Sequence, residues 1–168
     1  IGSTNITARN KLHRIFHFFK QKEGLLNVEG LVSVCHKLGT TRTGALIVIE
    51  RSVPLDFVIA TGDKMNLELS GPIIESIFYK NSPLHDGAIV IRGNTIVATR
   101  VILPVAAEDT LPKRYGLRHR AAVSITEKTD ATALVVSEET GHISYFKNGN
   151  FVRFATEEEL IKMIQEDN

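Results

Sequence analysis

The chain has 168 residues, of which 43% are apolar and 23% are charged, and its formal net charge is +1. This length suits one domain with a sizeable core, and the composition is typical of a soluble globular protein. The near-neutral charge disfavours a nucleic-acid-binding surface built on bulk positive charge. Cys35 is the single cysteine, which excludes an intramolecular disulfide and a cysteine-rich zinc site. No apolar stretch is long enough to span a bilayer, and because the chain begins at Ile1 we expect a fragment of a longer protein.

Apolar periodicity and capping residues predict five elements in the first half of the chain. They are a basic amphipathic helix over residues 7–22, a helix that Asn27 caps and Gly39 ends, a strand over 45–49, a weaker strand over 55–60 and a short helix over 70–79. The run over 45–49 is apolar throughout, which is typical of a strand covered on both faces. Cys35 lies on the apolar stripe of the second helix and is expected in the core.

The second half is predicted to be richer in strands. A hairpin is expected over 88–91 and 95–99, a polar loop over 106–115, a strand over 133–137, a second hairpin over 142–146 and 151–154, and a last helix from Thr156 to about residue 165. Residues 121–125 suit either a helix or a tightly packed strand. Together these elements predict one α/β (α+β) domain over residues 1–168, with a mixed, mostly antiparallel sheet of six or seven strands wrapped by helices.

Three polar clusters each lie beside a predicted strand end: His85-Asp86-Gly87, Arg118-His119-Arg120 and Ser137-Glu138-Glu139. Arginines bind phosphate oxygens through bidentate hydrogen bonds, and the start of a helix at Arg118 would add backbone amides. Carboxylates and a histidine can ligate a divalent ion that bridges protein and triphosphate. This inventory favours phosphoryl or nucleotidyl transfer. Taken singly, each cluster is more typical of a turn or a solvated charged run.

At these residues the sequence resembles a known family. Asp86-Gly87-Ala88 and Arg118-His119-Arg120 match the two signature motifs of the diadenylate cyclase (DAC) domain, and the segments 44–50, 81–88, 118–122 and 136–141 agree with it as well. The likeness extends over about residues 28–150 and is greatest to the membrane-anchored CdaA-type class.

The resemblance implies an enzyme that joins two ATP molecules into cyclic di-AMP with release of two pyrophosphates, using Mg, Mn or Co. Asp86 would lie near the 3′-hydroxyl of ATP and would bind metal or activate that hydroxyl, and His85 and Glu138 would be further metal ligands. The phosphates and ribose would be lined by Gly87, Arg118, Ser137 and Glu139, and the backbone near Leu103 would read adenine. Ala88, His119 and Arg120 would complete the motifs. Leu117 stands where many family members have threonine, so a hydroxyl contact to the nucleotide is missing there.

The resemblance also implies an assembly and a location. A homodimer with two facing sites would be needed for catalysis, and higher oligomers are possible. Transmembrane helices would precede the domain, on the cytoplasmic side of a bacterial membrane, and the partners would include a membrane-bound regulator and phosphoglucosamine mutase. Two alternatives to a cyclase stay open: a catalytically silent module that binds nucleotide or cyclic di-AMP, and a partner-binding domain whose N-terminal helix docks on a membrane or a regulator.

Overall fold

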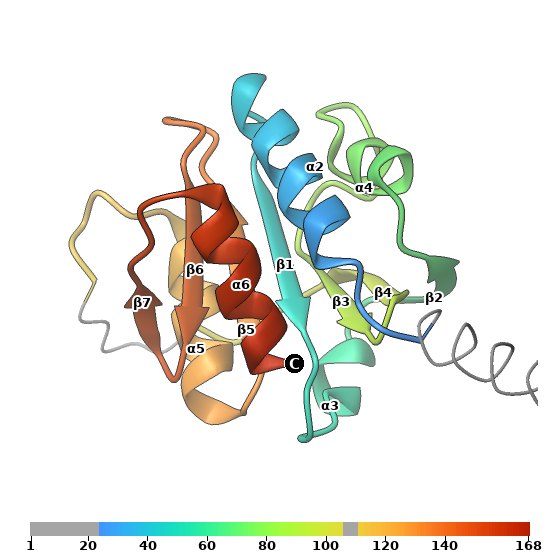
Figure 1. Ribbon diagram of the computed structural model, residues 1–168. Coiled ribbons are helices and arrows are strands. Elements are labelled where there is room, and N and C mark those ends of the chain that lie inside the picture. The colour runs from blue at the N-terminus through green and yellow to red at the C-terminus, as the bar shows by residue number, and fades with distance from the viewer. Residues whose placement is uncertain (1–23, 106–110) are drawn as a thin grey trace, which may run out of the picture.

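The computed structural model describes residues 24–105 and 111–168 as a mixed sheet with helices on both faces (Figure 1). Its strands are β1 (Ala45–Ile49), β2 (Asp63–Glu68), β3 (Ala88–Arg92), β4 (Thr95–Val101), β5 (Thr132–Val136), β6 (Ile143–Lys147) and β7 (Asn150–Val152). Its helices are α2 (Val28–Thr40), α3 (Asp56–Ile59), α4 (Gly71–Phe78), α5 (Leu117–Lys128) and α6 (Glu157–Asp167). The helix predicted over 7–22 lies outside the described residues.

The seven strands are ordered β2-β4-β3-β1-β5-β6-β7. Strands β1 and β3 are parallel, with Ile47 opposite Ile89, and the other five pairings are antiparallel. The prediction of a mostly antiparallel mixed sheet is therefore confirmed. All five residues of β1 are buried, as expected for a central strand with helices on both faces.

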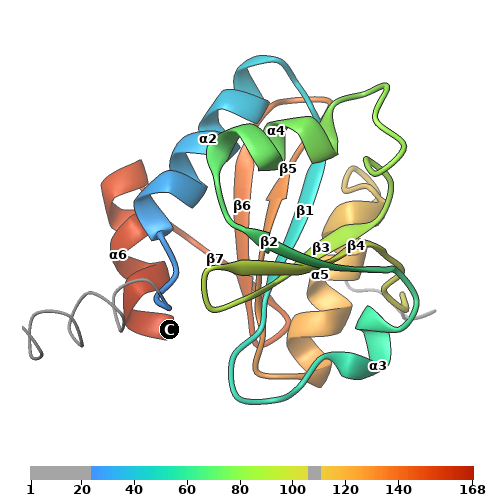
Figure 2. The same cartoon turned by 90° about the vertical axis from the view of Figure 1, so that its right-hand side faces the viewer.

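Two apolar cores lie on opposite faces of the sheet, under the helices that Figure 2 shows on its two sides. Helices α2, α4 and α6 pack on one face, where Ile47 and Ile49 of β1 point, and α3 and α5 pack on the other, where Leu46 and Val48 point. Cys35 lies in the first core, and burial raises the pKa of its thiol to about 12, which confirms a core residue rather than a nucleophile.

Three helices begin at a side-chain cap, which was predicted for Asn27 and Thr156 and is also found at Ser70. The side chains of Asn27, Ser70 and Thr156 accept hydrogen bonds from the amides of Gly30, Ile73 and Glu159 at 3.0, 3.3 and 3.2 Å. The open choice for residues 121–125 is settled as helix, because these residues belong to α5.

The strand predicted over 55–60 is wrong, because residues 56–59 form helix α3. Leu55, Val58 and Ile59 are buried against the second core, and this spacing belongs to a helix rather than to a strand. Strand β2 was not predicted. It lies at the sheet edge, pairs with β4 alone and has no buried residue. Its sign in the sequence is the alternation of half-buried Met65 and Leu67 with exposed polar residues, which is too short to identify a strand by itself.

At the end of the sheet where β1 finishes, Glu50 forms a tightly held ion pair. Its carboxylate accepts hydrogen bonds from Arg92 Nε at 2.6 Å, Arg92 Nη2 at 2.9 Å and the Leu55 amide at 2.9 Å. The hydrogen bond from Arg92 is the main cause that lowers the pKa of Glu50. A carboxyl whose pKa is lowered on folding stabilises the fold above its unfolded pKa and loses that contribution as pH falls through the folded pKa.

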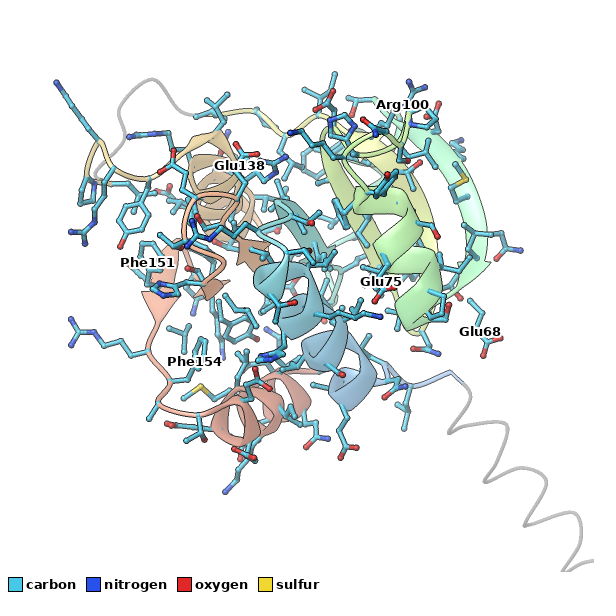
Figure 3. The ribbon with its side chains drawn as sticks, turned by 90° about the horizontal axis from the view of Figure 1, so that it is seen from above. Glu68, Glu75, Arg100, Glu138, Phe151 and Phe154 are labelled. Atoms are coloured by element: carbon cyan, nitrogen blue, oxygen red, sulfur yellow. The ribbon has the colours of Figure 1, made fainter. Side chains whose placement is uncertain are left out.

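We expect Glu50→Gln to lower the free energy of unfolding by about 1–3 kcal/mol at pH 7, because a charged acceptor of three hydrogen bonds is lost. Since the parent loses the same contribution below about pH 4.5, the difference should shrink between pH 5 and pH 3, as measured by urea unfolding. Glu68→Gln is a matched control, because Glu68 is an exposed residue at the end of β2 (Figure 3). A difference between Glu50→Gln and the parent that is independent of pH would contradict this assignment.

Candidate active site

Sheet topology brings distant segments together at one end of the molecule. Parallel β1 and β3 both begin at this end, and β4 and β5, which run antiparallel to them, both finish there. The register places Ala45 opposite Val136 and Ala88 opposite Val101. The residues just before β1 and β3 therefore meet the residues just after β4 and β5. Figure 3 looks down on this end, with Arg100 on β4 and Glu138 in the turn that follows β5.

A cleft of about 1160 Å³ opens at this end of the sheet. Its volume lies slightly above the usual range for small-molecule sites, about 300–1,000 Å³. The predicted site residues that line it are His85, Asp86, Gly87, Leu103, Leu117, Arg118, Glu138 and Glu139. The fold thus joins members of all three polar clusters in one cleft.

Asp86 lies at the mouth of this cleft, just before β3. Its side chain is 86% exposed, and its Oδ1 lies 3.3 Å from His85 Nε2. The other ring nitrogen, Nδ1, lies 2.7 Å from the Ser82 carbonyl oxygen and therefore carries the hydrogen that it donates. In the neutral ring, Nε2 then keeps its lone pair and faces the same region as the Asp86 carboxylate.

Gly87 follows with a positive φ of 82°. A Cβ atom there would lie 2.8 Å from the Val101 carbonyl oxygen and 2.9 Å from the Arg100 carbonyl carbon. Both neighbours are backbone atoms of the adjacent strand, so residue 87 has neither the conformation nor the space for a side chain. Glycine is what allows Asp86 to lie this close to the end of β4.

Arg118 provides a cation on another wall of the cleft. It is the second residue of α5, so it lies beside the free backbone amides at the start of this helix, and its side chain is 27% exposed. Its Nη1 lies 3.6 Å from Glu138 Oε2, which is longer than a hydrogen bond. The guanidinium and the start of the helix together suit an anionic group such as a phosphate.

His119 and Arg120 contact the segment that leads into this helix. His119 is 8% exposed, and its ring centroid lies 5.2 Å from that of Tyr115 and 6.2 Å from that of Phe146. Burial is the main cause that lowers its pKa, which favours the neutral ring. Arg120 donates hydrogen bonds to the carbonyl oxygens of Tyr115 and Pro112, both at 3.3 Å. Both side chains therefore hold the segment that leads into Arg118.

Ser137 does not line the main cleft. It lines an adjoining cleft of about 220 Å³, together with His119 and with residues that belong to both clefts. Its Oγ accepts hydrogen bonds from the amides of Glu139 and Thr140, both at 3.2 Å, and so shapes the turn after β5. Ala88 and Arg120 line neither cleft. Ala88 is buried at the start of β3.

The predicted metal ligands are only partly brought together. His85 and Asp86 are adjacent, whereas Glu138 faces Arg118. Within residues 24–105 and 111–168, no group of three His, Cys, Asp or Glu side chains is placed to hold an ion. One carboxylate and one imidazole suit a divalent transition ion such as Mn²⁺ or Co²⁺ whose other positions are taken by water and substrate phosphates, and the carboxylate by itself suits Mg²⁺.

Sequence reasoning missed several residues of the cleft. Thr41, Arg42 and Thr43 line it from the connection between α2 and β1, and Tyr79 and Lys80 line it from the end of α4. The Tyr79 side chain is 61% exposed, so an aromatic face is available for stacking. For Thr41, Arg42 and Thr43 the sequence did offer a signal, namely a polar, threonine-rich connection that leads into a fully buried strand.

Comparison with known proteins identifies the class that this fold and cleft define. Residues 32–151 match the sequence family described as DisA bacterial checkpoint controller nucleotide-binding, abbreviated DAC. The chain belongs to the DAC family. The resemblance seen in the motifs at Asp86 and Arg118 is thereby confirmed.

Individual relatives agree with this assignment. The chain is 44% identical over 119 residues to diadenylate cyclase CdaS of Bacillus thuringiensis, a match that covers 71% of this chain and 59% of the relative. It is 40% identical over 138 residues to the cyclic di-AMP synthase CdaA of Bacillus subtilis, covering 82% of this chain and 50% of that protein. The chain thus spans only about half the length of these relatives.

Solved structures share the fold. A double-cysteine variant of DacA from Staphylococcus aureus superposes with a TM-score of 0.79 at 36% identity, covering 83% of this chain and 93% of that one. A hypothetical membrane-spanning protein from Bacillus cereus gives a TM-score of 0.74 at 35% identity, covering 87% and 78% of the two chains. In the part of the present chain that the structure describes, no helix is both long and apolar enough to cross a membrane.

Proposed function

We propose that this domain is a diadenylate cyclase that condenses two ATP molecules into cyclic di-AMP and two pyrophosphates. The observation that carries the proposal is one cleft of about 1160 Å³ with the Asp86 carboxylate and the Arg118 guanidinium on its walls. A proton acceptor and a phosphate-binding cation in one cleft are what nucleotidyl transfer requires. The names of the relatives as diadenylate cyclases support the choice of ATP and of this product.

In the proposed reaction, the 3′-hydroxyl oxygen of one ATP attacks the α-phosphorus of the other. A new phosphodiester bond forms, the bond between the α-phosphorus and the bridging oxygen breaks, and pyrophosphate leaves with the electron pair. The hydroxyl proton passes to the Asp86 carboxylate, and the same exchange at the second hydroxyl closes the ring. Arg118 and the amides at the start of α5 stabilise the negative charge on the phosphate oxygens. Gly87 keeps the backbone beside Asp86 open to the ribose.

A divalent ion, Mg, Mn or Co, would be held by Asp86 and His85 Nε2 together with ATP phosphates. When bound, it would neutralise phosphate charge and lower the pKa of the attacking hydroxyl. In this proposal Glu138 becomes a further ligand of the ion when a phosphate group of ATP replaces the Glu138 carboxylate beside Arg118. Glu139, Ser137 and the backbone near Leu103 would bind the remainder of the nucleotide, with Tyr79 offering a stacking face to the base. Leu117 adds apolar surface where a threonine would offer a hydroxyl.

The test of this proposal is incubation of the chain with ATP and Mn²⁺ or Mg²⁺, with the product identified by mass spectrometry. Cyclic di-AMP and pyrophosphate in a ratio of one to two would support the cyclase. If neither metal yields product, calorimetric titration of ATP and cyclic di-AMP onto the same sample distinguishes a silent binding module, which still binds, from a domain that handles neither ligand. A silent module would replace the proposed catalysis with binding alone, and a domain that binds neither ligand would overturn the proposed function altogether.

Because one cleft carries one set of reactive groups, the proposed reaction needs two protomers with facing clefts. The 86% exposed Asp86 side chain supports this arrangement, since its carboxylate can reach a nucleotide held by a second protomer. We expect specific activity to fall in proportion to concentration once the protein is diluted below its dimer dissociation constant. Initial rates across a thousandfold dilution series, with sedimentation at the same concentrations, measure this effect. A constant specific activity in samples shown to be monomeric would contradict the facing-site arrangement.

The longer protein is proposed to be anchored on the cytoplasmic side of a bacterial membrane, with residues 1–168 as its one catalytic domain. The membrane-spanning description of the Bacillus cereus relative supports this location. A membrane-bound regulator and phosphoglucosamine mutase remain predicted partners, and higher oligomers remain a predicted state. Co-purification of the membrane-embedded full-length protein with each candidate partner tests these predictions.

A further inference from the structure

Gly44, the residue just before β1, lies in the main cleft directly against the guanidinium of Arg118. A Cβ atom on residue 44 would lie 2.6 Å from Arg118 Nη1, 2.7 Å from Cζ and 3.1 Å from Nη2. Ordinary van der Waals separations between such atoms are about 3.5–4.0 Å. Because three atoms of one planar group are this close, the guanidinium occupies the volume that any side chain at residue 44 would need.

The backbone supplies no other reason for a glycine here. Among the glycines that the structure describes, those with positive φ are Gly87, Gly93, Gly141 and Gly149, and Gly44 is not one of them. The nearest atoms to a Cβ at residue 44 all belong to Arg118, whereas a Cβ at Gly39 or Gly62 would first meet a backbone carbonyl oxygen. Alanine at residue 44 is therefore compatible with the fold and incompatible with this position of Arg118.

The remaining surroundings of Arg118 leave its donors available. Among the residues that the structure describes, its charged neighbour is Glu138, with Oε2 at 3.6 Å from Nη1. A guanidinium has five N–H donors in a fixed plane, so an anion can bind two of them side by side once the orientation of that plane is set. Because residue 44 has no side chain, the guanidinium lies against the backbone of Gly44, and this contact sets the orientation of the plane.

We propose that Gly44 is a positioning residue. Because residue 44 has no side chain, it leaves a space, called the seat below, in which the Arg118 guanidinium is held in position to bind a phosphate. The inference deepens the proposed function, since it rests on that function for the identity of the phosphate as part of ATP. It does not depend on turnover, because the seat acts on the binding of a phosphate group. Gly44 acts only through Arg118.

The first test compares Gly44→Ala with Gly71→Ala. We expect Gly44→Ala to lower kcat/KM for ATP by about 100-fold, the effect of displacing one charge-assisted phosphate contact. Gly71 lies at the start of α4, and a Cβ there has no other atom within 4 Å, so Gly71→Ala should retain the parental kcat/KM. Thermal unfolding should show both variants within a few degrees of the parent, because alanine also restricts the unfolded chain. Parental kcat/KM for Gly44→Ala would overturn the proposal.

A double-mutant cycle separates this role from a general structural one. In an Arg118→Ala background the seat has nothing to hold, so adding Gly44→Ala should change kcat/KM by less than about twofold. An equal loss in both backgrounds would show that residue 44 acts elsewhere and would overturn the proposal. If Gly44→Ala fails to fold, the same cycle still decides, since removing the Arg118 side chain should restore folding only if the clash is with that side chain.

Two readouts remain if the parent chain forms no cyclic di-AMP. Calorimetric affinity for ATP with Mn²⁺ should show the same pattern across the cycle, so failure of the cyclase and failure of the seat can be told apart. A crystal structure of Gly44→Ala should show the Arg118 guanidinium displaced from the residue 44 backbone. An unmoved guanidinium in that structure would overturn the proposal, whatever the activity of the domain.

Discussion

Asp86→Asn is expected to lower the rate of cyclic di-AMP formation by about 100- to 10,000-fold, the range for loss of a general base. Asparagine has nearly the same shape but cannot accept the hydroxyl proton, and it is a weaker ligand for a divalent ion. Because the side chain is 86% exposed, the free energy of unfolding should change by less than about 0.5 kcal/mol. Arg118 is untouched by the change, so affinity for ATP should fall much less than the rate.

Single-turnover rates with Mn²⁺, together with calorimetric ATP affinities, measure these two effects separately. Asp56→Asn is the matched control, because Asp56 is also a well-exposed carboxylate, 73% exposed, at the start of α3. It should retain the parental rate. Full activity of Asp86→Asn would show that another group accepts the proton and would remove Asp86 from its proposed role.

Gly87→Ala is expected to be the most destabilising of these substitutions, by about 2–4 kcal/mol. Part of this cost is the left-handed conformation, which penalises a residue with a Cβ by about 1–2 kcal/mol. The rest arises because the new Cβ would lie 2.8 Å from the Val101 carbonyl oxygen and 2.9 Å from the Arg100 carbonyl carbon, both in the backbone of β4. Since β4 must move to relieve the contact, Asp86 moves with it, and the rate should fall by about 100-fold in the folded fraction.

Urea unfolding and initial rates at a temperature where the variant is folded measure both effects. Gly149→Ala provides the control, since Gly149 has a similar φ of 77° in the turn between β6 and β7. Its Cβ would meet Glu127 Cβ and Cγ at 3.0 and 3.4 Å, which is a milder contact than that at residue 87, so we expect a loss of about 1 kcal/mol and an unchanged rate. Equal stability losses at residues 87 and 149 would contradict the backbone clash inferred for residue 87.

Much of the fold could be predicted because its signals are local. The uninterrupted apolar run over 45–49 identifies a strand covered on both faces, and Asn27, Ser70 and Thr156 begin helices through contacts within three residues of chain. The two errors have the opposite cause. The alternation of Met65 and Leu67 in β2 covers too few residues to establish a strand without the pairing with β4, and α3 is too short for its period to be distinguished from that of a strand.

The candidate site divides in the same way. Which side chains can bind phosphate or metal follows from residue type, so the clusters at Asp86, Arg118 and Glu138 could be named from the sequence. Their meeting in one cleft follows from the register of β1 with β3 and β5, which pairs residues more than forty positions apart along the chain. The contributions of Arg42, Tyr79 and Lys80 to the cleft depend on the same long-range arrangement.

The sequence by itself determined the chemical inventory, the family and most helices and strands of this protein, because these depend on residue type and on neighbours a few positions away. The tertiary structure alone decided that Glu138 faces Arg118 rather than Asp86, that Ser137 shapes a turn beside the main cleft, and that Gly44 lies beneath a guanidinium seventy-four residues further along the chain. Each of these results depends on strand register and side-chain packing between distant segments, which no local pattern encodes.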